Sequence, residues 1–272
     1  MPFFKTQSGI NLHYEIYPRS SAKQLTFIHG HLGSTRWWAP VLNEIKKQNL
    51  KLNTNLDESV VLIDFHGCGE SDSPQNIENF TFETVIQDLN DLLLSLNLPE
   101  YNLIGHSAGG LIVLHLLAIN PSQYKAGVMI SPVGLHGLKF DDSLYPIYDK
   151  MVKNFEITKK VIGSTIYMND DTSDFFNQVI AIDAYKGIQK LNSRFVDLLK
   201  NYSSEHITSN VRQKNLIIHG RNDHLLPLKD SEELNQTLIH SEIEIIENAG
   251  HCPIIETPLT IAQAILRFYY NV

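Results

Sequence analysis

The chain has 272 residues, of which 43% are apolar and 19% are charged, a balance typical of a globular protein with a large buried core. Its formal net charge of −8 argues against nucleic acid or an anionic membrane as a partner, because neither attracts an acidic protein. The N-terminus lacks a secretory signal pattern, no apolar run could span a bilayer, and two cysteines are too few for a disulfide framework. We therefore expect a cytoplasmic monomer or homodimer, with Cys68 and Cys252 reduced, that acts on a small molecule.

The first predicted element is an antiparallel hairpin, in which the alternating segments 3–7 and 10–17 flank Ser8-Gly9. Six short apolar runs rich in β-forming residues follow, at residues 25–29, 60–64, 101–105, 128–131, 215–219 and 242–247. Runs of this kind suit strands that are covered on both faces.

Helical patterns lie between several of these runs, at residues 82–96, 108–119, 229–238 and 258–270. Strands that alternate with helices in this way predict an α/β fold with a doubly wound, mostly parallel sheet of eight strands. The alternation stops between residues 136 and 214, where the apolar spacing is helical throughout. We predict a helical cap at 136–214 and a core formed by residues 1–135 and 215–272.

The strongest local motif is Gly105-His106-Ser107-Ala108-Gly109, which follows a predicted strand and opens an apolar helix. A nucleophile on such a turn has a strained backbone, and small residues two before and two after it let strand and helix pack closely. Because the pentapeptide is common by chance, its placement between strand and helix carries the prediction that Ser107 is the nucleophile.

A serine nucleophile needs a base to remove its proton and an acid to orient that base. Among 12 histidines, His251 follows the last predicted strand, and Asp223 follows the strand before it. Both lie at carboxyl ends of strands, where α/β sheets place their ligands. The chain order Ser107, Asp223, His251 is the order that this architecture requires, so we predict His251 as the base and Asp223 as the orienting acid.

Four other histidines have ordinary structural interpretations. His224 adjoins the predicted acid in a tight turn, where neighbouring side chains point apart. His219 falls inside an apolar strand and His115 inside an apolar helix, so both are expected to be buried and hydrogen-bonded. His106 should point away from the nucleophile, toward the pocket wall or the core.

Attack on a carbonyl group places negative charge on its oxygen, and N–H donors aimed at that oxygen stabilise it. One expected donor is the amide of Ala108, the residue after the nucleophile. The other comes from the glycine-rich loop 29–34, where Gly30 permits a sharp turn and the amide of His31 is the predicted donor. Leu32 is the alternative donor, and a turn without a catalytic role is the alternative interpretation of the loop.

Together these segments resemble the α/β-hydrolase superfamily, specifically its small enzymes with a helical cap. The resemblance rests on residues 29–31, 64–71, 105–109, 220–223 and 250–251. This branch usually carries Arg-Gly-His-Gly after the fourth strand, whereas this chain has His66 at the arginine position and Cys68 at the histidine position. A serine nucleophile excludes the chemistry of family members with a nucleophilic aspartate. Related enzymes of the menaquinone pathway hold an acidic substrate with an arginine soon after the elbow, which this chain lacks, so a strongly anionic substrate is disfavoured.

Candidate pocket residues of the predicted cap are Tyr145, Tyr148, Met151, Phe155, Phe175, Phe176 and Phe195. Such residues can cover an apolar acyl chain or an aromatic ring. We predict Trp37, His106, Tyr148 and Phe176 as substrate-binding residues. Trp37 and its neighbour Trp38 could instead anchor the following helix in the core.

The predicted function is hydrolysis of a carboxylic ester through an acyl-enzyme, as in a carboxylesterase. The same three catalytic residues would also serve a thioesterase, a lactonase, an amidase, or a carbon–carbon bond hydrolase acting on a vinylogous diketone. An alternative from another class is a catalytically idle ligand-binding protein, as some plant hormone receptors on this fold are. Neither zinc-type Cys/His spacing nor a phosphate-binding loop occurs in the sequence, so we expect no metal and no cofactor.

Overall fold

The computed structural model describes residues 2–17, 24–52, 59–74, 80–139, 141–200 and 202–270. Its centre is one eight-stranded sheet with the strand order β1-β2-β4-β3-β5-β6-β7-β8. The strands are β1 (Phe3–Lys5), β2 (Asn11–Tyr17), β3 (Gln24–Ile28), β4 (Ser59–Ile63), β5 (Tyr101–His106), β6 (Tyr124–Ile130), β7 (Lys214–Gly220) and β8 (Ser241–Ile246). β1–β2 and β2–β4 pair antiparallel, and the pairings from β4 to β8 are parallel, which confirms the predicted mostly parallel α/β sheet.

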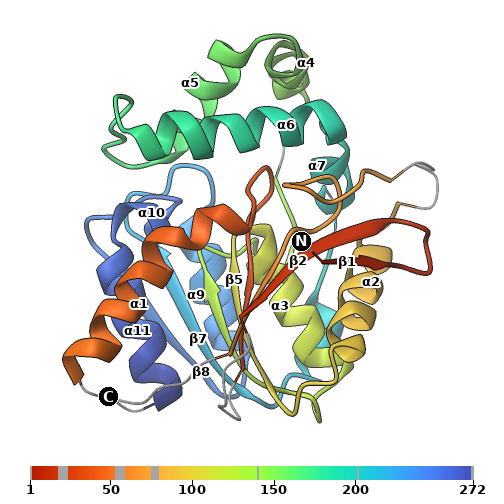
Figure 1. Cartoon of the computed structure of the whole chain (residues 1–272), viewed down its shortest axis with the longest axis vertical. Coiled ribbons are helices and arrows are strands. Elements are labelled where there is room, and N and C mark those ends of the chain that lie inside the picture. The colour runs from red at the N-terminus through yellow and green to blue at the C-terminus, as the bar shows by residue number, and fades with distance from the viewer. Residues whose placement is uncertain are drawn as a thin grey trace.

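Helices cover both faces of this sheet (Figure 1). One core cluster joins the sheet to α2 (Phe82–Ser95), α3 (Ala108–Ile119) and α9 (Leu228–Thr237), and a second joins it to α1 (Ala39–Leu52) and α11 (Pro258–Tyr270). Side chains alternate between these clusters along each strand: in β5, Leu103 belongs to the first and Ile104 to the second. Because both faces are buried, the parallel strands read as unbroken apolar runs.

Strand β6 begins four residues earlier than the apolar run that predicted it. Lys125 and Gly127 lie just before that run and break the apolar pattern there, yet Gly127 still pairs with Leu103 of β5. A side chain at position 127 would meet Leu117 of α3, so the glycine allows the helix to approach the strand closely. Packing between helix and strand, which an apolar pattern does not reveal, explains the difference.

The segment between β6 and β7 is helical. It contains η3 (Asp142–Leu144), α4 (Tyr145–Lys153), α5 (Phe155–Thr165), η4 (Phe176–Ile180), α6 (Ala181–Leu191), α7 (Arg194–Leu199) and α8 (Glu205–Thr208). In Figure 1, α6 runs across one edge of the sheet, and α4 and α5 lie farther out on the same side. A short helix, α10 (Pro253–Glu256), follows β8. Across the described ranges, the helices are all too short or too polar to cross a membrane.

Candidate active site

Ser107 lies on the turn between β5 and α3, with φ 54° and ψ −118°. This left-handed backbone is uncommon outside glycine and marks local strain. Glycines on either side make it possible: a Cβ at Gly105 would overlap the carbonyl oxygen of Gly109, and a Cβ at Gly109 would overlap that of Ile28 in β3. The elbow, residues 105–109, is therefore packed backbone against backbone, as the motif predicts.

Ser107, His251 and Asp223 form one chain of hydrogen bonds, although they come from three different loops. The Oγ of Ser107 lies 3.0 Å from Nε2 of His251, and Nδ1 of His251 lies 2.8 Å from Oδ2 of Asp223. The side chains of His251 and Asp223 are buried, and Ser107 is 9% exposed. The structure thus brings together the three residues selected from the sequence.

Hydrogen bonds keep the carboxyl group of Asp223 ionised. Burial alone would raise its pKa, but the hydrogen bond and charge of His251 and the backbone N–H of Leu226 outweigh burial and hold the pKa below its usual value. Its Oδ1 accepts from the amides of Leu225 and Leu226, at 2.8 and 2.9 Å. Because the ionised carboxylate can only accept, Nδ1 of His251 donates to it, and Nε2 is left with a free lone pair facing Ser107.

The backbone around His251 is held by two further side chains. Nε2 of His106 donates to the carbonyl oxygen of His251 at 2.8 Å. The carboxyl group of Glu256 accepts from the amides of Gly250 and Cys252, which flank the histidine. Burial lowers the pKa of His106 to about 3, so its ring stays neutral and can donate in this way.

The 29–34 loop lies directly beside Ser107. A Cβ at Gly30 would lie 3.1 Å from the Cβ of Ser107, so the loop backbone touches the nucleophile's side chain. Gly33 N–H donates to the carbonyl of Gly30 at 3.0 Å, and Leu32 takes φ 65°, which gives the sharp turn expected from the sequence. Ala108, the other predicted donor, is the first residue of α3, where a backbone N–H has no intrahelical acceptor.

The ring nitrogens of His31 are buried, although the residue as a whole is partly exposed. Its ring stacks on Phe195 of α7, with centroids 5.0 Å apart and planes at 13°. Neither ring nitrogen has a hydrogen-bond partner among the residues that the structure describes, and burial lowers the ring's pKa to about 3. The backbone of Leu32, the alternative oxyanion donor, interacts instead with the thiol of Cys68 and lowers the pKa of that thiol against the effect of burial. This arrangement favours the amide of His31 over that of Leu32.

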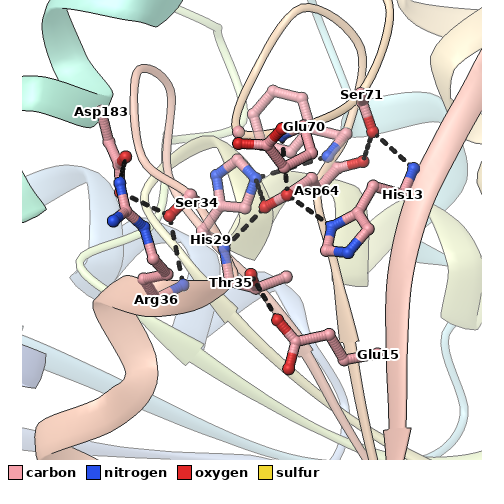
Figure 2. A network of polar contacts seen from close by, with 12 residues as sticks. His13, Glu15, His29, Ser34, Thr35, Arg36, Asp64, Glu70, Ser71 and Asp183 are labelled. Atoms are coloured by element: carbon pink, nitrogen blue, oxygen red, sulfur yellow. Dashed lines mark hydrogen bonds and ion pairs between the residues drawn. The ribbon is translucent and has the colours of Figure 1, made fainter. Parts of the chain in front are cut away.

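A buried carboxylate, Asp64, ties the 29–34 loop to the strands around it (Figure 2). Its Oδ1 accepts from the amide of Thr35 at 2.6 Å, and its Oδ2 accepts from Nδ1 of His13 at 2.7 Å. Its Oδ2 also accepts from the amide of Glu70 at 3.0 Å. Because these partners belong to β2, to the start of η1 (Thr35–Trp38) and to the loop after β4, one carboxylate fixes three segments.

The predicted pocket residues have different surroundings. Trp37 is 3% exposed and touches Gly33, so it packs directly behind the 29–34 loop, whereas Trp38 is fully buried against Phe27 in the core. Phe176 is 4% exposed and packs against α5, and burial raises the pKa of Tyr148 to about 12.

His219 and His115, which the sequence interpretation treats as structural, have hydrogen-bond partners. His219 is buried and bonded to Ser231 and to the carbonyl of Leu226, and His115 is bonded to Ser204 and Tyr202. His224 is exposed. Cys68 and Cys252 are buried free thiols, and no cluster of three or more His, Cys, Asp or Glu side chains within the described residues could hold a metal ion.

Three carboxylates around the site received no role from the sequence: Asp64, Asp183 and Glu256. Asp183 is 2% exposed in α6, where it accepts from Ser34 Oγ at 2.6 Å and from the guanidinium of Arg36. An acid at the end of a buried strand, or one within the apolar face of a helix, is the signal that could have indicated Asp64 and Asp183. Glu256 carries no such signal.

The sequence matches the family model of the alpha/beta hydrolase fold over residues 25–155. A curated relative, the 2-hydroxy-6-oxo-2,4-heptadienoate hydrolase of Pseudomonas putida, is 26% identical over 85% of this chain and 83% of its own length.

Solved structures agree in fold. An esterase from Exiguobacterium antarcticum superposes with a TM-score of 0.81 at 17% identity, covering 98% of each chain. The enol-lactonase of Burkholderia xenovorans gives a TM-score of 0.80 at 17% identity, covering 98% of this chain and 99% of its own. The chain therefore has the α/β-hydrolase fold, and its sequence is similar to those of hydrolases of that superfamily.

Proposed function

We propose that this hydrolase cleaves a carboxylic ester of a small, largely apolar substrate through an acyl-enzyme on Ser107. The observation that carries the proposal is the chain of hydrogen bonds from Ser107 through His251 to an ionised Asp223. A serine hydroxyl becomes an effective nucleophile when an oriented imidazole can take its proton, and this arrangement supplies that imidazole.

Acylation begins when Nε2 of His251 accepts the hydroxyl proton as Ser107 Oγ attacks the ester carbonyl carbon. The carbonyl π electrons move onto oxygen, and the amides of His31 and Ala108 donate to the resulting oxyanion. The carbon–alkoxy bond then breaks, and the proton held by His251 passes to the leaving alcohol. Asp223 stays ionised throughout and stabilises the imidazolium that forms between these two transfers.

Deacylation repeats the sequence with water. His251 takes a proton from the water as its oxygen attacks the acyl carbon, and the same two amides stabilise the second oxyanion. Collapse of this intermediate breaks the acyl–serine bond and returns the proton to Ser107 Oγ. The products are the carboxylic acid and the free serine.

Residues 136–214 form the proposed cap, and residues 1–135 and 215–272 form the core that carries the catalytic groups. The stacking of His31 on Phe195 supports this division, because it places a residue of the 136–214 segment against the loop beside Ser107. Phe176, Tyr148 and Trp37 are the proposed substrate-binding residues, and their apolar surfaces suit an acyl chain or aromatic ring. His106 contributes through the His251 backbone.

Carbon–carbon bond hydrolysis is the second candidate, because the curated relative from Pseudomonas putida is named for a dienoate substrate. A carboxylate substrate needs a cation to hold it. The arginine that follows the 29–34 loop, Arg36, is already paired with Asp183, which favours the neutral ester.

The test has two parts. A fluorophosphonate probe should label Ser107, located by peptide mass spectrometry, and Ser107→Ala should lose the label and at least about 10⁴-fold of kcat/KM. A panel should then compare p-nitrophenyl acetate, p-nitrophenyl hexanoate, a hexanoyl thioester and a 2-hydroxy-6-oxo-dienoate, with EDTA present. An unlabelled, folded protein would overturn the nucleophile assignment. Faster turnover of the dienoate than of the esters would replace ester cleavage with carbon–carbon cleavage.

A further inference from the structure

The 29–34 loop is attached to helix α6 by a hydrogen bond between two buried side chains. Ser34 Oγ donates to Oδ2 of Asp183 at 2.6 Å, and Ser34 and Asp183 are each 2% exposed. The guanidinium of Arg36 pairs with the other carboxylate oxygen. The attachment falls three residues after His31, the proposed oxyanion donor.

The bond to Asp183 also sets the direction of the Ser34 hydroxyl. Ser34 is the N-cap of η1, where its Oγ accepts from the amide of Arg36 at 3.1 Å. A hydroxyl group has one hydrogen, so donating it to Asp183 turns the oxygen lone pairs toward that amide. Asp183 thereby holds the end of the loop and the start of η1 in one conformation.

Helix α6 touches the same loop a second time, one turn further on. A Cβ at Gly187 would lie 3.3 Å from the Cδ2 of Leu32 and 3.4 Å from its Cα, so the helix backbone approaches the loop backbone closely. Asp183 and Gly187 are four residues apart and share a helix face. The helix therefore contacts the loop on both sides of Gly33.

Thr35, the residue that follows Ser34, is bound by a carboxylate of the core. The amide of Thr35 donates to Asp64, while Ser34 and Arg36 bind Asp183 (Figure 2). Consecutive residues are thus bound by two carboxylates, one from the core and one from α6. The position of the loop depends on both.

We infer that Asp183 is a positioning residue, which sets the placement of the His31 amide by fixing Ser34. This inference rests on the proposed function, because it concerns the oxyanion donor of that reaction. Misplacing a catalytic group by about 1 Å can cost on the order of 100-fold in rate. Losing Asp183 should therefore reduce kcat, since an oxyanion forms only during reaction, and should leave KM nearly unchanged.

The test compares Asp183→Ala and Ser34→Ala with p-nitrophenyl acetate, whose small acyl group limits contact with the cap. Each variant should lower kcat by about 10- to 100-fold and change KM by less than about 3-fold. The double variant should be no worse than the more impaired single variant, because each single variant already removes the bond between Ser34 and Asp183. Asp183→Asn keeps an acceptor oxygen for Ser34 and should recover most of kcat.

Lys190→Met is the matched control. Lys190 Nζ binds the carbonyls of Gly69 and Ser71, so it attaches α6 to the loop after β4 and not to the 29–34 loop. If general loosening of α6 lowered kcat, this variant would lose as much as Asp183→Ala. An equal loss in the two variants, or wild-type kcat in Asp183→Ala and Ser34→Ala, would overturn the inference.

Amide hydrogen exchange separates this inference from the proposed function. Peptides covering residues 29–38 should exchange faster in Asp183→Ala than in the wild type or in Lys190→Met. This readout requires no substrate. Failure of the wild type to cleave esters or to be labelled would reject the proposed function, whereas unchanged exchange in these peptides would reject the role of Asp183.

Discussion

The elbow at residues 105–109 and the 29–34 loop lie on either side of the proposed reaction centre, but they are held in different ways. The elbow is fixed by close backbone packing, in which Gly105 lies against Gly109 and Gly109 lies against Ile28 of β3. The 29–34 loop is held by side chains, with Asp64 on the core side and Asp183 on α6. The elbow is held by the sheet, whereas the 29–34 loop is held jointly by the core and by the proposed cap.

This difference means that the proposed nucleophile and the proposed oxyanion donor are positioned by different parts of the molecule. The placement of Ser107, the proposed nucleophile, follows from the sheet itself, so movement or replacement of the proposed cap should leave it unchanged. The placement of the proposed oxyanion donor follows partly from α6, so the proposed cap can affect the rate of reaction as well as the choice of substrate. Branches of a family with different caps would then differ in both properties.

The largest effect should come from the elbow. In Gly109→Ala the added Cβ would overlap the carbonyl oxygens of Ile28 and His29, which are backbone atoms of β3 and its loop and cannot turn away. We expect kcat/KM to fall by at least about 100-fold, together with a lower melting temperature. Gly110→Ala meets the ring of Pro132 instead, 2.9 Å away, and should lose less. Equal losses in the two variants would contradict the account of the elbow.

The next effect concerns the core side of the 29–34 loop. Asp64→Asn removes the charge that pairs with His13 in a fully buried site, and breaking such a pair costs about 3 kcal/mol of unfolding free energy. Asp183 pairs with an arginine that is 47% exposed, a type of pair worth about 1 kcal/mol or less. Urea unfolding should therefore rank Asp64→Asn well below Asp183→Asn in stability. If Asp183→Asn were the less stable variant, α6 and not the core would be the main support of the 29–34 loop.

A third effect tests whether the elbow supports His251 as well as Ser107. His106→Leu removes the donor to the carbonyl of His251, a hydrogen bond worth about 1 kcal/mol, so kcat should fall by about 5-fold. His106→Gln places an amide nitrogen near the position of Nε2 and should retain most activity. If His106→Gln and His106→Leu are equally impaired, the ring matters for packing and not for this bond.

The sequence predicts the elbow better than it predicts the 29–34 loop, for a physical reason. Gly105, Ser107 and Gly109 are adjacent in the chain and act through backbone geometry, which leaves a local pattern. The strands are likewise recognised from local patterns in the sequence. The order of Ser107, Asp223 and His251 follows from one rule of topology. Eight strands and the three hydrogen-bonded residues could be identified in this way.

The supports of the loop leave no such pattern. Asp183 is 149 residues from Ser34 in the chain, and nothing in the sequence between residues 136 and 214 fixes the path of α6. Glu256 accepts from the amide of Tyr167, which is 89 residues away in the chain. Such contacts follow only from the three-dimensional arrangement, so the proposed cap and its polar links to the core could not be predicted in detail.

The smallest effect is a pH dependence confined to the core side of the loop. The hydrogen bond to Asp64 raises the pKa of His13 above its ordinary 6.5 despite burial, and the nearby Glu15 and Glu70 act in the same direction. The pKa of Asp64 is lowered from 3.8, because the bonds from His13 and from two amides outweigh burial.

A raised histidine pKa adds stability that is fully present below pH 6.5 and is lost as the pH rises through the folded-state value. A lowered aspartate pKa adds stability that is lost as the pH falls below 3.8, through the folded-state value. The pair should therefore stabilise the protein most between these limits. His13→Asn keeps a donor near Nδ1 but is never charged, so its deficit in melting temperature relative to the wild type should be larger at pH 5.5 than at pH 9. Equal deficits at both pH values would mean that His13 binds Asp64 as a neutral ring. The core would then hold the 29–34 loop independently of pH across this range, as it holds the elbow.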